Sequence, residues 1–213
     1  MNVIINAIKK SKSRDMMMML YWIPYLLIFK KLEISDKSYH IIESSIDNII
    51  PFISVFVYPY LFWFVYMAIC IVYLFIYDKK VYRHLMIFII LGYSLGLIVF
   101  MIYPSVQNLR VDLTGIQSLS VQLVNYIYGL DTNTNVCPSI HVIGALGAML
   151  IMLRTDLMKN NTKMKVLNII VGISICLSTM FIKQHSFIDV SFGIVITLVL
   201  YNYTKSLSTK LFE

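Results

Sequence analysis

Two histidines in this sequence have neighbours that could support nucleophilic and acid–base chemistry. His185 and Asp189 lie four residues apart within the stretch STMFIKQHSFIDV. On a helix, residues at this spacing are neighbours, so the carboxylate can reach the imidazole, fix its tautomer and support a positive charge on the ring. A histidine held in this way is a candidate nucleophile, and His141, delivered from another segment, could protonate the departing oxygen.

The stretch NVCPSIHV, residues 135–142, predicts a binding site for an anion. Pro138 favours the first turn of a helix, where unpaired backbone N–H groups and the positive end of the helix dipole attract a phosphate. Ser139 adds a hydroxyl donor, and Arg110 and Lys183 could add positive charge from two other loops. The candidate phosphate-binding residues are therefore Arg110, Asn135, Ser139 and Lys183.

The elements that must position these residues are membrane-spanning helices. Hydrophobic residues make up 59% of the 213 residues and charged residues 14%, and the mean hydropathy is +0.76, which excludes an ordinary soluble domain. A span needs about 20 mostly apolar residues. The apolar runs that we predict as spans cover residues 16–29, 49–77, 85–103, 136–153, 166–182 and 187–203. We therefore predict an all-α polytopic membrane protein, a six-transmembrane-helix bundle that forms one domain over residues 1–213.

The segment 106–130 is too polar to span a membrane, but it has an apolar periodicity. Apolar residues recur at intervals of three or four, which is typical of an amphipathic helix. They are Leu113, Ile116, Leu119, Leu123, Ile127 and Leu130. We expect this helix to lie in the membrane interface between the third and fourth spans.

The distribution of Lys and Arg predicts the orientation. The segments 9–14, 79–83, 154–165 and 205–210 hold 13 of the 18 basic residues. By the positive-inside rule, both termini then face the cytoplasm and the candidate site faces the exoplasmic side. This topology and anionic headgroups account for the net charge of +7, so we expect no nucleic-acid partner. The many Ile, Lys, Asn and Tyr residues are typical of an AT-rich bacterial genome, which indicates the plasma membrane.

These motifs resemble those of the type 2 phosphatidic acid phosphatase superfamily. The second and third signatures of that family correspond to Pro138-Ser139-x-His141 and to Ser178-x6-His185-x3-Asp189, and Arg110 resembles the arginine of the first. The branch of inositol phosphorylceramide and sphingomyelin synthases is the most similar. The residues that carry this further likeness are Asp131, Asn135, Thr179, Lys183 and Gln184.

The resemblance implies a reaction and a role for each residue. His185 would attack phosphorus to form a phosphohistidine, Asp189 would orient it, and His141 would act as the acid toward the leaving group. Ser139 and Arg110 would bind the phosphoryl oxygens. Enzymes of this family need no metal or other cofactor, and the partner would be a lipid phosphate or diphosphate in the membrane.

The sequence also departs from the family pattern. Tyr103 and Val111 stand where the first motif has Lys and Pro, and Thr179 stands where the third has Arg. Two phosphate-binding cations are thus missing, and Lys183 could replace one of them. The departures leave open a phosphotransfer to an alcohol acceptor in place of hydrolysis.

Two other classes of function use the same residues. Cys137 and His141 are four apart, as are His185 and Asp189, so two helix faces could present four ligands to zinc in a metal-dependent hydrolase. A non-catalytic transporter or scaffold could keep the polar groups for lipid binding. The sequence does not distinguish phosphatidate, lysophosphatidate, phosphatidylglycerol phosphate and polyprenyl diphosphate as substrates, and it does not indicate an oligomeric state.

Overall fold

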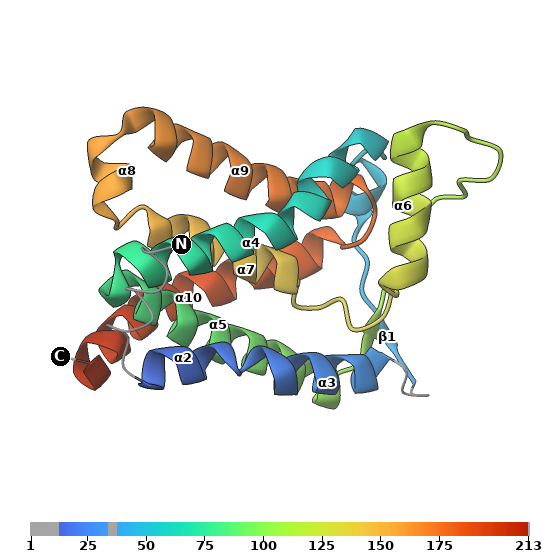
Figure 1. Cartoon of the computed structure of the whole chain (residues 1–213). Coiled ribbons are helices and arrows are strands. Elements are labelled where there is room, and N and C mark those ends of the chain that lie inside the picture. The colour runs from blue at the N-terminus through green and yellow to red at the C-terminus, as the bar shows by residue number, and fades with distance from the viewer. Residues whose placement is uncertain (1–12, 34–37, 213) are drawn as a thin grey trace.

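The computed structural model describes residues 13–33 and 38–212, and the protein is mostly helical (Figure 1). The α-helices are α2 Ser13–Met19, α3 Trp22–Glu33, α4 Val57–Tyr77, α5 Lys79–Ile102, α6 Leu119–Leu130, α7 Ile140–Met152, α8 Asp156–Asn160, α9 Thr162–Phe181 and α10 Phe187–Phe212. Two short 3-10 helices, η1 Ser45–Asn48 and η2 Ser54–Phe56, precede α4, and the strands β1 His40–Ile41 and β2 Ser105–Val106 pair in parallel. The residues 1–12, 34–37 and 213 of the predicted single domain, with Lys9, Lys10 and Lys12 of the orientation argument, lie outside the described residues.

Four helices in the described part of the chain are long and apolar enough to cross a membrane. They are Ser54–Tyr77, Lys79–Ile102, Thr162–Phe181 and Phe187–Phe212. The prediction of a helical membrane protein is confirmed at this level, whereas the count of six spans stays a prediction. The helix within predicted span 136–153 is α7, which has 13 residues and begins only at Ile140.

The first predicted span, 16–29, is not one continuous helix. It divides into α2 and α3 at Leu20 and Tyr21. Pro24 explains the break, because proline lacks the N–H that would donate to the carbonyl of Leu20 and is tolerated only in the first turn of a helix. An apolar run alone does not reveal such a break.

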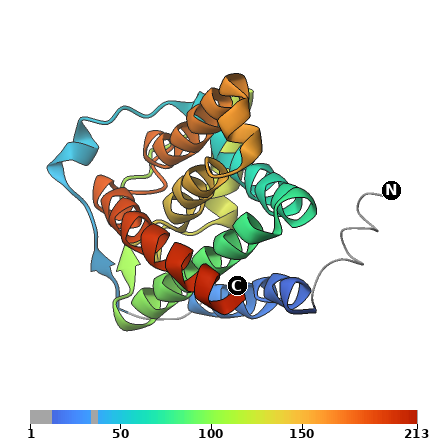
Figure 2. The same ribbon diagram turned by 90° about the vertical axis from the view of Figure 1, so that its left-hand side faces the viewer.

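Helix α7 lies in the centre of the bundle. It packs against α4, α5, α9 and α10, which enclose it in the view along the bundle (Figure 2). Glycines allow the close approach: a Cβ atom at Gly96 of α5 would lie 2.5 Å from Cδ1 of Ile140, and one at Gly147 of α7 would collide with the ring of Phe88. The element that begins at the candidate site is therefore fixed on several sides.

Helix α6 lies across one end of the bundle, over the start of α4 (Figure 1). It is shorter than the predicted segment 106–130, and its buried apolar side chains are Val121, Val124 and Ile127. Leu119 and Leu130, which we predicted on the apolar face, are 65% and 61% exposed. The helix therefore buries one apolar side against the bundle and exposes further apolar residues. Its position in a membrane interface stays a prediction.

At the opposite end of the bundle, several buried polar groups have protein partners, although Nζ of Lys79 there has no hydrogen bond within the described residues and lies over the ring of Phe75. Arg83 binds the buried carboxylate of Asp15 through two hydrogen bonds, of 2.7 and 3.0 Å. His84 is fully buried, and Arg154 donates to its Nδ1 at 2.6 Å. That bond makes Nδ1 an acceptor, so Nε2 carries the proton and donates to O of Tyr201 or to Thr204 Oγ1. These residues join α2, α5, α10 and the start of the α7–α8 connection.

Candidate functional site

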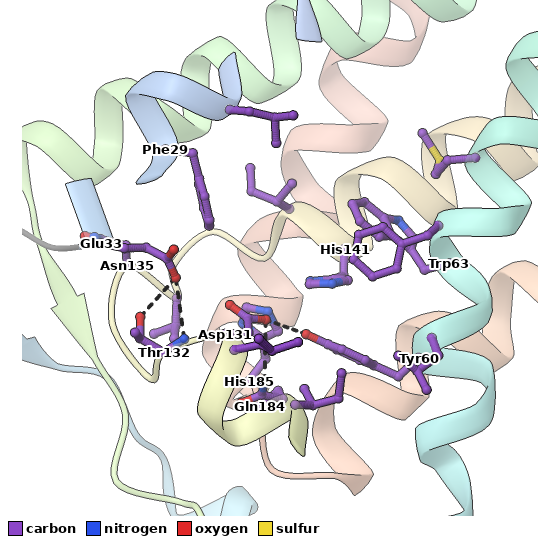
Figure 3. Close-up of a pocket in the computed structure, with 18 of the residues that line it drawn as sticks. Phe29, Glu33, Tyr60, Trp63, Asp131, Thr132, Asn135, His141, Gln184 and His185 are labelled. Atoms are coloured by element: carbon purple, nitrogen blue, oxygen red, sulfur yellow. Dashed lines mark hydrogen bonds between the residues drawn. The ribbon is translucent and has the colours of Figure 1, made fainter. Parts of the chain in front are cut away.

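A cavity of about 620 Å³ lies between α3, α4 and α6 and reaches the start of α7 (Figure 3). Most of its wall is apolar, with Trp22, Phe29 and Phe100 among the lining residues. Polar side chains gather at the end of the cavity next to α6, where the α9–α10 turn and the 131–136 loop meet. They are Glu33, Tyr60, Asp131, Thr132, Thr134, Asn135, His141, Gln184 and His185.

The predicted pairing of His185 with Asp189 is present at the start of α10. Nδ1 of His185 lies 3.4 Å from Oδ2 of Asp189. Ser186 holds the carboxylate in place, because its N–H donates to Oδ2 at 2.9 Å and its Oγ accepts from the Asp189 N–H at 3.2 Å. This is a reciprocal cap of the helix. With Nδ1 facing the carboxylate, Nε2 is the ring nitrogen left for a ligand in the cavity.

His141, in the first turn of α7, reaches the same cavity. Its ring lies between Tyr60 and Trp63, with centroid distances of 4.5 and 4.4 Å, and its centroid is 5.8 Å from that of His185. No described residue hydrogen-bonds to its ring nitrogens. Ring contacts therefore hold this imidazole, and its nitrogens are left for a ligand.

Ser139 has a structural position. Its hydroxyl accepts from the N–H of Val142 at 3.4 Å and so caps α7, and its own N–H donates to O of Asp189 at 3.2 Å. The residue is fully buried and is not among the residues that line the cavity. It therefore fixes the start of α7 against α10, which brings the two histidines to one place.

Arg110 lies behind the cavity and binds the end of α6. Its guanidinium donates to O of Tyr128 at 2.7 Å, to O of Asp131 and to Oε1 of Gln184 at 2.7 Å. Burial lowers the pKa of Arg110, and the nearby Asp131 opposes this shift. The contact of Arg110 with the cavity is thus indirect, through Gln184.

Lys183 is separated from the cavity, although it is adjacent in sequence to residues that line it. Its φ of 57° turns the chain, and Nζ donates to O of Asp47 at 2.7 Å and to O of Ile50 at 2.5 Å. Burial lowers its pKa, and Asp47 opposes the shift. The ammonium group holds the segment before α4 against the α9–α10 turn, and Gln184 occupies the cavity wall where we expected a cation.

Asn135 lines the cavity in a backbone conformation that is rare for a side-chain-bearing residue, with φ of 52°. Its Nδ2 donates to O of Leu32 at 3.1 Å, which ties the loop to α3. Its Oδ1 is buried without a partner among the described residues. The free atom is a hydrogen-bond acceptor, which suits a hydroxyl donor better than a phosphate oxygen.

The sequence analysis gave no role in the site to Tyr60 or Glu33, and it named Asp131 only as part of the family likeness. The hydroxyl of Tyr60 donates to Oδ2 of Asp131 at 2.6 Å, and Glu33 accepts from the hydroxyl of Thr132 at 3.1 Å (Figure 3). Burial, together with Asp131, raises the pKa of Glu33. No Lys or Arg is found among the described residues that line the cavity. The polar end of the cavity therefore presents acidic groups where the predicted phosphate cradle had cations.

A weak signal for these residues is present in the sequence. Tyr60 and Trp63 are two aromatic residues with polar atoms, three apart within an apolar run, and this spacing places them on one helix face. Asp131 directly follows the amphipathic segment. Neither feature alone distinguishes a site residue from ordinary packing.

The four residues of the zinc hypothesis do not form a ligand set. Across residues 13–33 and 38–212, no three His, Cys, Asp or Glu side chains are grouped so that they could hold a metal ion. Cys137 lies outside the helices and near Asp189. Burial is the main cause that raises the pKa of its thiol to about 12, and the negative charge of Asp189 adds to this shift. A thiol in this state is a poor metal ligand.

Comparison with known proteins adds no further assignment. The chain matches no protein-family model, no curated protein and no solved structure.

Proposed function

We propose that the protein is an integral membrane lipid-phosphate phosphatase that resembles the type 2 phosphatidic acid phosphatases. It hydrolyses a phosphomonoester or diphosphate through a phosphohistidine and uses no metal. The observation that carries the proposal is the position of His141 and His185 at the polar end of an apolar cavity, where their ring centroids lie 5.8 Å apart. Apolar walls suit the chain of a lipid, and the histidines suit its phosphate.

The two histidines divide the reaction between them. Nε2 of His185 attacks phosphorus, the bond from phosphorus to the ester oxygen breaks, and His141 gives its proton to that oxygen. Water then attacks the phosphohistidine, His141 takes the proton of the water, and phosphate leaves with His185 restored. Asp189 accepts from Nδ1 throughout and stabilises the positive ring.

The cavity offers limited positive charge to the phosphate. His141 supplies part of it once the bound phosphate has favoured protonation of its ring. Arg110 acts indirectly, because its bond to Oε1 of Gln184 orients the amide, whose Nε2 donates to Oδ2 of Asp131 at 3.5 Å and has a second N–H that a phosphate at the cavity could use. In this mechanism Ser139 and Lys183 position the backbone, and neither touches the phosphate.

The arrangement of the helices supports the proposed topology. We propose six spans in the plasma membrane, cytoplasmic termini, and a site near the exoplasmic surface. Arg14 donates to O of Leu211 at 3.0 Å, so the first and last described helices meet at one end of the bundle. Helix α6 and the cavity lie toward the other end (Figure 1). An α6 across the bundle suits a position in the interface.

Release of phosphate from lipid phosphates in EDTA tests this proposal. We expect purified protein in detergent to release phosphate in the chelator, and His185→Ala to abolish the release. His40→Ala is the matched control, since His40 is exposed and stacks on Tyr103 away from the cavity. Release that requires a metal, or that persists in His185→Ala, would contradict the proposal.

A second candidate, transfer to an alcohol, is favoured by the acceptors of the site. Glu33, Asp131 and the unpartnered Oδ1 of Asn135 could each accept a hydrogen bond from a hydroxyl group. An alcohol in place of water would then receive the phosphoryl group or phosphorylated headgroup from His185. Product analysis with and without a polyol decides between them: a new phosphodiester or phosphomonoester of the polyol indicates transfer, and phosphate alone indicates hydrolysis.

A further inference from the structure

Asp47 lies far from His185 in the sequence, but it contacts the turn that carries this histidine. It belongs to the short 3-10 helix η1, drawn in blue at the periphery of the bundle beside the start of α10 (Figure 2). Asp47 is buried, with 3% of the residue exposed. A buried carboxylate needs hydrogen-bond donors, because it has given up its contacts with water. The donors that bind Asp47 therefore indicate which part of the molecule it stabilises.

Two residues, one on each side of His185, bind Asp47. Nζ of Lys183, two residues before the histidine, donates to the backbone O of Asp47 at 2.7 Å. The backbone N–H of Phe187, two residues after the histidine, donates to Oδ1 of Asp47 at 2.7 Å. Oδ2 accepts from the N–H of Ser44 at 2.7 Å and from its hydroxyl at 3.2 Å, which fixes the orientation of the carboxylate. His185 therefore lies between two bonds to a single residue.

The bond to Phe187 supplies an acceptor that α10 itself lacks. Phe187 is the first residue of this helix, where the N–H groups have no carbonyl partner within the helix. The preceding N–H, that of Ser186, already donates to Asp189, the residue that orients His185. Asp47 satisfies the next N–H from outside the helix, and a carboxylate at this position also suits the positive end of the helix dipole.

We infer that Asp47 is a positioning residue for the nucleophile: through its bonds to Lys183 and Phe187 it fixes the turn that carries the imidazole of His185. The inference rests on the proposed function, in which Nε2 of His185 attacks phosphorus while Nδ1 faces Asp189. A fixed turn keeps Nδ1 at the carboxylate of Asp189 and Nε2 toward the cavity. Asp47 is not among the residues that line the cavity, so it acts through His185 and not on the substrate.

The tautomer of the His185 ring tests this role without any substrate. In protein labelled with ¹⁵N-histidine, we expect the neutral wild-type ring to carry its proton on Nδ1, because the hydrogen bond of one ring nitrogen fixes the tautomer. Asp47→Ala should shift the population toward the Nε2–H form. Asp47→Asn keeps an oxygen that can accept from the N–H of Phe187, and it should retain most of the Nδ1–H form. The spectrum of His185→Ala assigns the signal.

Turnover of dioctanoyl phosphatidate and of farnesyl diphosphate measures the effect on the reaction. Asp47→Ala should lower kcat by about 10- to 100-fold, as a misplacement of about 1 Å can do. The KM value should stay near that of the wild type, because the lost alignment matters only in the transition state. Damage to folding alone would instead reduce the amount of active protein and leave kcat of the folded fraction unchanged.

Glu43→Ala is the matched control, because it removes another carboxylate of the same segment. Oε1 of Glu43 also accepts from a backbone N–H at 2.7 Å, but this N–H belongs to Asn108 and not to α10. We expect the tautomer and kcat of Glu43→Ala to match those of the wild type.

A second variant removes the same bond from its donor side, in case Asp47→Ala does not fold. Phe187→Pro has no N–H to donate, and proline is favoured at the first position of a helix. It should shift the tautomer of His185 as Asp47→Ala does, whereas Phe187→Leu, which keeps the N–H, should not.

The tautomer and the turnover distinguish failure of this inference from failure of the proposed function. An unchanged Nδ1–H form in Asp47→Ala, or in Phe187→Pro if the first variant does not fold, would overturn the inference. An equal change in Glu43→Ala would overturn it as well. Absence of hydrolysis of every lipid phosphate by the wild-type protein would overturn the proposed function itself.

Discussion

Histidines at the two ends of the bundle differ in their hydrogen bonds. At the end away from α6, both ring nitrogens of His84 have protein partners. At the cavity end, only ring contacts hold His141, and Oδ1 atoms of Asn135 and Asp189 are buried without described partners. Polar groups whose partners are all within the protein stabilise one arrangement of helices. Polar groups without a protein partner can instead form hydrogen bonds with a ligand. The comparison therefore indicates a structural role for His84 and leaves the ring nitrogens of His141 available to a ligand.

Substitution of the two histidines is the strongest test of this comparison. We expect His141→Ala to lower kcat by about 10²- to 10⁴-fold, the usual contribution of a general acid, with little loss of stability. His84→Ala should instead lower the thermal unfolding temperature, because Arg154 and Thr204 lose their partner, and should leave kcat of the folded protein near the wild-type value. Turnover and unfolding curves in one detergent measure both, and the reverse pattern would refute the assignment.

The ion pair of Asp15 and Arg83 tests how much the far end stabilises the bundle. Arg83→Leu removes the two hydrogen bonds of Arg83 from the Asp15 carboxylate, which is 1% exposed. Removing one partner of a buried pair costs about 3–5 kcal/mol of unfolding free energy. Thermal unfolding should show this loss, and Lys159→Leu provides the control, because its pair with Asp156 is exposed. Equal effects of the two variants would contradict a structural role for the far end.

Substitution of Gly144 tests whether the close packing of α7 against Trp63 and Tyr93 tolerates an added side chain. Gly144→Ala places a methyl group against Trp63 and Tyr93, and overpacking of this kind costs about 1–3 kcal/mol. Gly129→Ala is the control, since nothing lies within 4 Å of the added carbon, and it should stabilise α6 by up to about 1 kcal/mol. Chemical unfolding of both variants gives the two free energies, and a stabilised Gly144→Ala protein would show that the packing has room there.

The smallest expected effect concerns the reactivity of Cys137. Its raised pKa of about 12 means that little thiolate exists at neutral pH, so alkylation should stay slow and accelerate only as the pH rises toward that value. Asp189→Asn removes a charge that disfavours the thiolate and should accelerate alkylation at a fixed pH. A protein that retains Cys137 while Cys70 and Cys176 are replaced by alanine isolates the rate. Fast labelling at neutral pH would indicate an open, solvated entrance to α7.

Patterns that act within one segment predict this protein well. The apolar runs of α4, α5, α9 and α10, and the spacing of His185 and Asp189, are local properties, and the structure contains each of them. The start of α4 is less local. The predicted run begins at residue 49, but the helix begins at Val57, after a loop whose carbonyls bind Lys183.

The rest of the site depends on contacts between distant segments. The packing of α4, α6 and α7 against one another brings Tyr60, Trp63 and Asp131 close to His141. The spacing of apolar residues within one helix does not predict which helices pack together. Lys183 illustrates the opposite error. Its charge and position favoured a phosphate ligand, but a positive φ directs its ammonium group to carbonyl oxygens on the other side of the turn. The residue type indicated which chemistry is possible, and the backbone conformation determined which part of the molecule the side chain reaches.

The joint between α4 and α5 limits how the two helices can be placed relative to each other. Asp78 alone separates the two helices, and its side chain accepts from the N–H of Val81 at 3.0 Å, so the connection has no slack. Tyr60 lies 18 residues before this joint, a lever arm of about 27 Å along the helix. The position of Tyr60 at the cavity is therefore tied, along one continuous helix, to a connection that has no spare residue at the opposite end of the bundle.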